Sequence, residues 1–183
     1  MRTLATLLLF LVACKSAPPV KAEPETPSAQ LYYPLAVGNS WTYSIAGSPK
    51  QTVVEIIGRD GSWFLDDQRG RFRYDDEGVR DTNRYLLRAP IKAGTHWTSV
   101  EDLLVYRFEI TQVDATVVTE AGTFTHCVVV RNSSTVKKDR TFVTEWTYAP
   151  NVGIAQIVTT IVDGHGTVEE QVRLSLVTVH LAK

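Results

Sequence analysis

The side chain best suited to covalent chemistry near the start of the chain is the thiol of Cys14. It follows a mostly apolar run, residues 4–13, which is led by a single positive charge at Arg2. That run is too short to cross a bilayer as a permanent helix, which needs roughly 20 residues. A charge, a short apolar run and a small residue are instead typical of a secretory signal that is removed. We therefore predict that residues 1–13 are a signal peptide.

The tetrapeptide Leu11-Val12-Ala13-Cys14 resembles the lipobox of bacterial lipoproteins. The resemblance implies cleavage before Cys14, which would then carry a diacylglyceryl thioether and an acylated amine. A firm anchor needs more than one acyl chain, because each buried methylene contributes only about 0.8 kcal/mol. In lipoproteins of the enterobacterial type, Lys15 in place of Asp implies export to the outer membrane. We therefore expect a lipid-anchored protein of the cell envelope, facing the periplasm or the cell surface. The alternative is an ordinary signal peptide in which Cys14 is incidental.

The second thiol, Cys127, stands next to His126, and this pairing raises the question of a cysteine–histidine site. Neighbouring residues on a strand point to opposite faces, so the two side chains cannot cooperate directly. Once Cys14 is lipidated, Cys127 has no partner for an intramolecular disulfide. A lone cysteine in an oxidising compartment is either buried or paired between chains. We predict burial.

No other spacing of residues predicts catalysis or a metal. The remaining histidines lie in unrelated segments without zinc-ligand spacing. The acidic residues 75–77 lack the spacing of an EF-hand, and no serine has the GxSxG context of a hydrolase. A metal site assembled from distant segments stays open as an alternative. We predict no catalytic residues, no metal, no cofactor and no enzymatic activity.

Charge and composition separate a tether from a domain. The 183 residues include 19 Lys and Arg against 20 Asp and Glu, for a net charge of −1 at pH 7. This near-neutral balance lacks the basic surface that nucleic-acid binding needs. Residues 14–30 are rich in Pro, Ala, Glu and Lys without apolar periodicity, which predicts a lipidated cysteine and a disordered tether. Residues 31–183 are expected to form one all-β domain, a size that supports a single core.

Beyond residue 31, apolar and polar residues alternate with period two, which is typical of strands with one buried face. The alternation is clear at residues 41–45, 104–110 and 142–148, and turn dipeptides such as Asp60-Gly61 separate the runs. No stretch has helical periodicity over two turns. We predict an all-β fold with little or no helix. Its antiparallel sheet of about nine to eleven strands would be curved or partly closed into a β-barrel.

The last two strand regions have unusual patterns. Within residues 167–181 the apolar positions change parity, which predicts a β-bulge near Leu176-Val177. Residues 154–162 are apolar at both parities, so we expect both faces of that strand to be covered.

A nine-residue pattern occurs twice in the chain. Residues 34–42 read PLAVGNSWT and residues 90–98 read PIKAGTHWT. The Pro ends one segment, and the Gly supplies a backbone angle that other residues avoid. We interpret Trp41 and Trp97 as residues that close the core at the ends of the sheet, with ligand stacking as the alternative. Duplication and convergent turn chemistry both explain the pattern.

Three segments resemble envelope proteins that are often labelled TapB-like. They are YPL at residues 33–35 with GNSWTY at 38–43, AGTF at 121–124 followed by Cys127, and WTYAPNVG at 146–153. This class is similar to the open β-barrel of the lipoprotein carriers LolA and LolB. The resemblance implies the fold and carries almost nothing about activity. Asn151 replaces a Gly that is common in the class, and Asn also tolerates the left-handed conformation.

An excess of aromatic residues in the predicted strands suggests a function. The set exceeds what a thin sheet needs, and it comprises Trp41, Tyr43, Tyr106, Phe108, Trp146 and Tyr148. We predict that these residues bind a hydrophobic ligand or lipid against a concave sheet, without catalysis. The alternative is a structural or assembly lipoprotein that docks onto an envelope protein complex by its strand edges.

Overall fold

The computed structural model describes residues 27–137 and 139–182. One helical turn, α1 (Ala29–Tyr32), precedes twelve strands. The strands are β1 (Ser40–Ile45), β2 (Gln51–Asp60), β3 (Trp63–Asp66), β4 (Arg71–Asp75), β5 (Gly78–Arg80), β6 (Tyr85–Arg88), β7 (His96–Glu101), β8 (Leu104–Thr119), β9 (Gly122–Lys137), β10 (Arg140–Ala149), β11 (Gly153–Asp163) and β12 (Val168–His180).

All twelve strands belong to one antiparallel sheet, in the order β6-β5-β4-β3-β2-β1-β12-β11-β10-β9-β8-β7. The prediction of an antiparallel all-β fold is therefore confirmed, but the predicted count of nine to eleven strands is wrong. The difference comes from short strands such as β5, which has three residues and is too short to display an alternating pattern.

The sheet curls until its two edge strands, β6 and β7, come close together. Within the described residues no backbone ladder joins them, but side chains do. The Nε1 of Trp97 on β7 donates to the carbonyl of Tyr85 on β6 at 3.0 Å. The Tyr148 hydroxyl on β10 donates to the carbonyl of Leu86 at 3.2 Å, which also ties β6 to β10 across the curled sheet. The sheet is therefore barrel-like and nearly closed, in agreement with the prediction of a curved or partly closed sheet.

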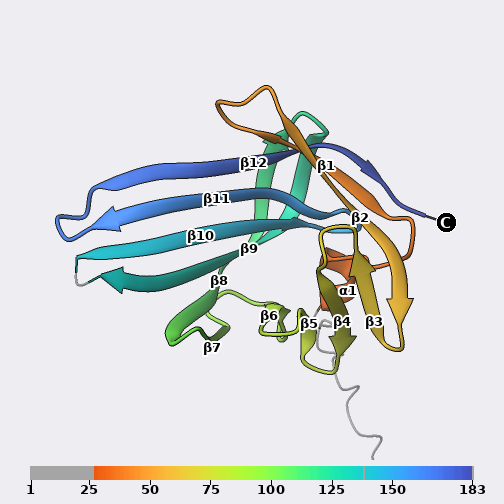
Figure 1. The fold of residues 1–183 in the computed structure, drawn as a ribbon, viewed down its shortest axis with the longest axis horizontal. Coiled ribbons are helices and arrows are strands. Elements are labelled where there is room, and N and C mark those ends of the chain that lie inside the picture. Colours follow the sequence, from red (N-terminus) through yellow and green to blue (C-terminus); the bar gives the residue numbers. More distant parts are fainter. Residues whose placement is uncertain (1–26, 138, 183) are drawn as a thin grey trace, which may run out of the picture.

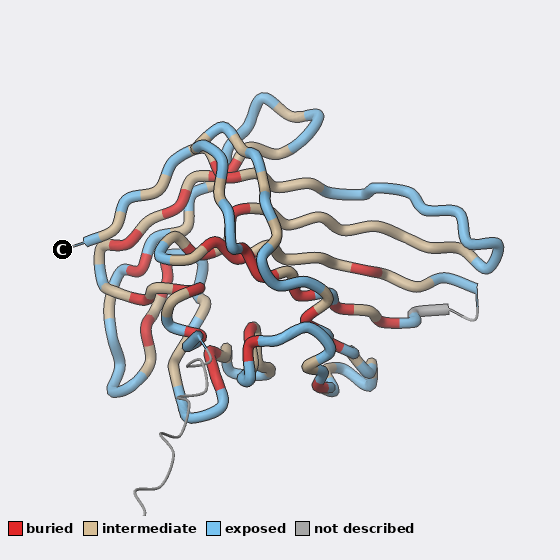
Figure 2. Tube along the Cα trace, turned by 180° about the vertical axis from the view of Figure 1, so that it is seen from behind, coloured by how far each residue is buried: buried red, intermediate tan, exposed pale blue. Residues whose placement is uncertain are grey.

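The distal parts of β9 to β12 project from the barrel as a wing, which consists of residues 131–137, 140–146, 156–163 and 168–174 (Figure 1). Figure 2 shows that buried residues gather mainly outside the wing. Residues 156–163 of β11 are only half-buried at every position. The expectation that both faces of this strand are covered is met in part: no residue from 154 to 162 is exposed, but neighbouring side chains shield each face only partly.

The last strand bends where its apolar pattern changes parity. Thr42 pairs with Thr178 and Tyr43 with Leu176, so Val177 is the extra residue of a bulge in β12. The predicted bulge is confirmed. It allows Leu176 to be fully buried while the following residues keep an apolar face against β1.

The repeated nine-residue pattern forms the same turn twice. Gly38 and Gly94 both have positive φ, and their N–H groups donate at 2.8 Å to the carbonyls of Ile56 and Ile110. In each copy the side chain after the glycine bonds back to the carbonyl of the proline: Asn39 at 2.8 Å and Thr95 at 2.7 Å. The sequence echo is therefore a structural echo that starts two hairpins, β1–β2 and β7–β8.

The core lies inside the curved part of the sheet and is rich in aromatic rings. Tyr33 lies 6.0 Å from Trp41 and 6.2 Å from Tyr148, measured between ring centroids. The chain after α1 is tied to β4, because the Tyr74 hydroxyl donates to the carbonyl of Tyr33 and accepts from the N–H of Leu35. Ala29 of α1 is also buried, so packed structure begins within the last residues of the predicted tether.

Three buried tyrosines make the fold sensitive to alkaline pH. Burial raises the pKa of Tyr33, Tyr43 and Tyr148 well above the ordinary value of 10. In the unfolded chain these phenols ionise near pH 10, so above that pH the unfolded state binds fewer protons and stability falls. We expect the free energy of unfolding to decrease by up to about 1.4 kcal/mol per pH unit for each such tyrosine. Urea denaturation between pH 9 and 11 measures how steeply the free energy of unfolding falls with pH. Tyr148→Phe should reduce this slope, and an unchanged slope would contradict a raised pKa for Tyr148.

Candidate functional site

Three of the six predicted ligand-binding aromatics lie in the packed core. Trp41 is 1% exposed, Tyr43 is 6% exposed and Tyr148 is 1% exposed. Their polar groups bond internally: the Trp41 Nε1 donates to the carbonyl of Val152 at 2.6 Å, and the Tyr43 hydroxyl donates to that of Ile154 at 2.9 Å. In this arrangement Trp41 and Tyr43 hold β1 to the turn and strand that follow residue 150, and Tyr148 holds β10 to β6.

The other three aromatics lie near a hollow at the junction of barrel and wing. Tyr106 and Trp146 line this hollow, which has a volume of about 440 Å³, and Phe108 is buried behind them. The rings of Trp97 and Phe108 stack at 5.3 Å, and Phe108 lies 6.3 Å from Trp146. The full lining is Arg84, Leu104, Tyr106, Asn132, Ser134, Phe142, Thr144, Trp146, Ile157 and Thr159.

Strand register places these residues on one face. Phe108 pairs with Asn132, Asn132 with Thr144, and Thr144 with Thr159, which forms a row across β8 to β11. Directly paired residues point to the same face of a sheet, and residues two apart along a strand share it as well. Tyr106, Phe108, Trp146 and Ile157 therefore project into the concave side, as the alternation predicted for β8 and β10.

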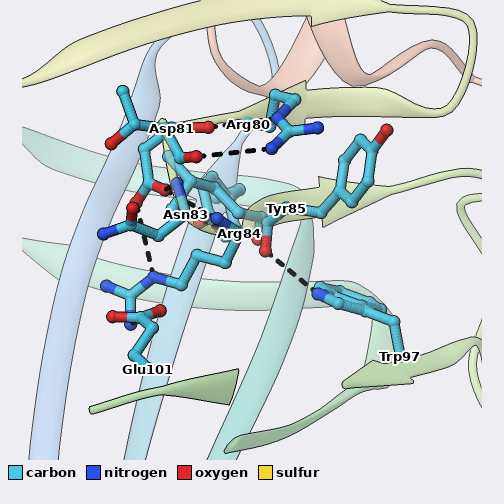
Figure 3. A network of polar contacts seen from close by, with 10 residues as sticks. Arg80, Asp81, Asn83, Arg84, Tyr85, Trp97 and Glu101 are labelled. Carbon is cyan, nitrogen blue, oxygen red and sulfur yellow. Dashed lines mark hydrogen bonds and ion pairs between the residues drawn. The ribbon is translucent and has the colours of Figure 1, made fainter. Parts of the chain in front are cut away.

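Arg84 forms the remaining side of the hollow, and it reaches there from the turn between β5 and β6 (Figure 3). The Asp81 side chain caps this turn by accepting from the N–H groups of Asn83 at 2.7 Å and Arg84 at 2.8 Å. The Arg84 guanidinium lies 3.4 Å from Asp81 and 3.7 Å from Glu101 of β7. The pair with Asp81 lies within the turn, whereas the pair with Glu101 joins this turn to the edge strand β7, and together they fix the position of the cation.

The same guanidinium lies over two aromatic rings of the site. Its central carbon is 5.8 Å from the ring centroid of Phe108 and 5.9 Å from that of Trp146. A cation within about 6 Å of a ring face is attracted by the ring quadrupole. The hollow thus combines an aromatic wall, a positioned cation and the polar side chains of β9.

Two of those polar side chains are unusually buried. Asn132 is 5% exposed and Ser134 is 4% exposed, although both line the hollow. Sequence reasoning missed Arg84, Glu101, Asn132 and Ser134. Asn132 and Ser134 lie two and four residues after the apolar Val130, and this spacing was the only sequence signal that placed them on the inner face of β9. Nothing in the sequence indicated that they lie near Arg84.

A second and larger groove, of about 670 Å³, lies mainly on the opposite face of β7 to β11. Its lining combines exposed charged residues, Arg107, Glu109 and Arg131, with the buried Trp97, Phe108 and Val143. Within residues 27–137 and 139–182, none of the buried side-chain polar atoms that lack a hydrogen-bond partner belongs to the lining of this groove.

Cys127 is a free, fully buried thiol, as predicted, and burial raises its pKa. His126 points away from it and contacts the carboxylate of Asp114 on the surface. The two adjacent residues therefore do not form a cysteine–histidine site. In the part of the chain that the structure describes, no group of three or more His, Cys, Asp or Glu side chains is arranged to hold a metal ion.

Asn151 adopts φ 59°, which is the left-handed conformation expected of it. Helical structure in the described ranges is confined to one short turn, and no helix there is long and apolar enough to cross a membrane. The predicted signal peptide, Cys14 and most of the tether lie outside the described residues.

The chain matches few known proteins. No family model matches the chain, and no curated protein matches it. Among solved structures, a crystal structure of a "putative lipoprotein" from Parabacteroides distasonis aligns with a TM-score of 0.42 and 13% sequence identity. The alignment covers 82% of this chain and 98% of that one.

Proposed function

We propose that the chain is a lipid-anchored protein of the cell envelope that binds a ligand, without catalysis, in the hollow of its concave sheet. The observation that carries the proposal is the aromatic wall of Tyr106, Phe142 and Trp146, which lines the hollow on the concave face of the sheet. An apolar ligand surface would cover these rings, each of which can contribute substantial contact area. The resemblance to TapB-like proteins and to the LolA and LolB barrel remains a prediction.

The anchor is proposed from the lipobox-like tetrapeptide that ends at Cys14. We expect the mature protein to carry three acyl chains at Cys14 and to sediment with outer membranes. The variant Cys14→Ser loses the attachment sulfur, so it should move to the soluble fraction while the domain stays folded. Intact-mass measurement and membrane fractionation check both points. A mature wild-type chain without acyl groups would remove the anchor from the proposal.

Ligand binding is tested on protein purified from its native envelope. We expect native mass spectrometry to detect a non-covalent ligand that is released on denaturation. The variant Trp146→Ala should lose most of it, because Trp146 is half-buried and lines the hollow. Trp63→Ala is the control, since Trp63 lies on β3, away from the lining residues. Equal loss in both variants, or no ligand in the wild type, would count against the hollow as a binding site.

The second proposal is a structural or assembly role, in which the protein docks onto an envelope complex by its strand edges. One observation favours it: the end of the β7–β8 hairpin exposes apolar side chains, with Leu103 96% exposed and Val100 68% exposed. In-cell crosslinking from position 103 should capture a specific partner if this role holds. If position 103 captures no partner, the assembly role is contradicted and only the ligand-binding proposal remains.

A further inference from the structure

Buried polar atoms without a hydrogen-bond partner concentrate around the hollow. The described residues contain five such side-chain atoms, and four of them belong to Arg84, Ser99, Glu101 and Asn132. Arg84 and Asn132 line the hollow. Ser99 and Glu101 pair with Tyr106 and Leu104, both of which line it as well. Because directly paired residues share a face, Ser99 and Glu101 lie on the concave side with Asn132, next to the hollow but outside its lining, and Arg84 reaches Glu101 from the β5–β6 turn.

Such a concentration is informative because buried polar groups in folded proteins almost always have a partner. The ion pairs of Arg84 with Asp81 and Glu101 do not satisfy its Nε or the Oε1 of Glu101 by hydrogen-bond geometry. The Asn132 side chain is 95% buried and its Nδ2 faces no protein acceptor. These atoms are covered by protein yet have no protein partner, so they favour a ligand that brings hydrogen-bonding groups to this side of the hollow.

The chemistry of the four atoms defines what a ligand must offer. The Nε of Arg84 and the Nδ2 of Asn132 need acceptors, whereas the Oε1 of Glu101 needs a donor, and the Ser99 hydroxyl can do either. A purely apolar molecule would leave all four unsatisfied. An anion would face Glu101 and Asp81, and a cation would face Arg84. A neutral molecule whose groups both donate and accept meets every requirement.

We propose, on the basis of the proposed function, that the ligand is a neutral, hydroxyl-rich molecule of the sugar class. A sugar ring presents C–H groups on its face, which suit the apolar wall of Tyr106 and Trp146. Its edge presents hydroxyls, each of which is both a donor and an acceptor, toward Arg84 and Asn132 of the lining, with Glu101 beside Arg84. Free oligosaccharides and the headgroups of glycolipids share this chemistry.

Calorimetric titration of the purified domain with three probes tests the inference: maltotriose, dodecyl maltoside and lauryldimethylamine oxide, the last two below their critical micelle concentrations. We expect dodecyl maltoside to bind and lauryldimethylamine oxide, which has the same tail length but no hydroxyl, to bind at least tenfold more weakly. Maltotriose binding as tightly as dodecyl maltoside identifies a free saccharide as the ligand class. Binding of dodecyl maltoside alone identifies a sugar headgroup on an apolar tail.

Two variants test which side chains bind the hydroxyls of the ligand. Asn132→Leu and Glu101→Gln should each weaken dodecyl maltoside at least tenfold, with circular dichroism confirming the fold. Glu145→Gln is the matched control, because Glu145 lies next to Trp146 in sequence and therefore on the opposite face of β10. Equal binding of the two detergents, unaffected by the variants, overturns the sugar inference and leaves the proposed function standing. Binding of no probe also overturns the inference, while the proposed function fails only if native mass spectrometry finds no ligand.

Discussion

Replacing Trp41 with alanine is expected to lower the free energy of unfolding by about 3–5 kcal/mol, the usual range for removing a large buried aromatic side chain. Trp41 is 1% exposed and packs against Tyr33. Its Nε1 also satisfies the carbonyl of Val152 at 2.6 Å, which links β1 to the turn before β11. Truncation therefore leaves both a cavity and an unpaired buried acceptor.

Urea denaturation measures this loss, and Trp63→Ala serves as the control. Trp63 is half-buried on β3 and contacts the guanidinium groups of Arg73 at 4.8 Å and Arg71 at 5.7 Å. Removing it should cost about 1–2 kcal/mol, since exposed cation–π contacts contribute roughly 0.5–1 kcal/mol each. If the two variants lose equal stability, Trp41 does not have the core role that we assign to it.

Gly78→Ala is expected to destabilise the protein by roughly 3 kcal/mol or more, from overpacking together with backbone strain. Gly78 has φ 150°, and a Cβ at this position would lie 2.1 Å from the carbonyl oxygen of Leu87. That oxygen is backbone in the adjacent strand β6, so relief requires the β5–β6 ladder to move. The turn that carries Arg84 connects these same two strands.

The matched control is Gly58→Ala in β2. No atom lies within 4 Å of a Cβ built there, and its φ is outside the left-handed region. Alanine at such a position restricts the unfolded chain without strain, so stability should stay the same or rise by about 0.4–1 kcal/mol. Thermal denaturation of the two variants side by side separates a local steric effect from a general preference for glycine. A tolerated Gly78→Ala would show that β5 and β6 are not paired as described.

Local patterns predicted those parts of the fold that depend on neighbours in sequence. Alternation identified the inner face of β8 and β10, and the parity change located the bulge at Val177. The repeated Pro-Gly-Trp pattern predicted two equivalent turns, and both form with the same hydrogen bonds. These features succeed because strand faces, bulges and turns are set by periodicity and backbone angles within a few residues.

The site could be predicted only in part, because it joins segments that are distant in sequence. Trp146 and Tyr106 were identified from alternation, but the same criterion selected Trp41 and Tyr148, which are in the filled core. Whether an inward ring faces a core or a hollow depends on how far the sheet curls. That curl brings Arg84 beside Glu101, and no local sequence pattern predicts this contact.

The most direct test of the central claim, that the concave hollow is a ligand site, is a heteronuclear NMR titration of the purified domain with dodecyl maltoside. Binding in the hollow predicts saturable shifts at the indole N–H of Trp146 and the side-chain amide of Asn132, while the indole of Trp63 stays unchanged. Saturable shifts that leave Trp146 and Asn132 unchanged, such as shifts confined to Trp63 and β2–β4, would contradict the claim.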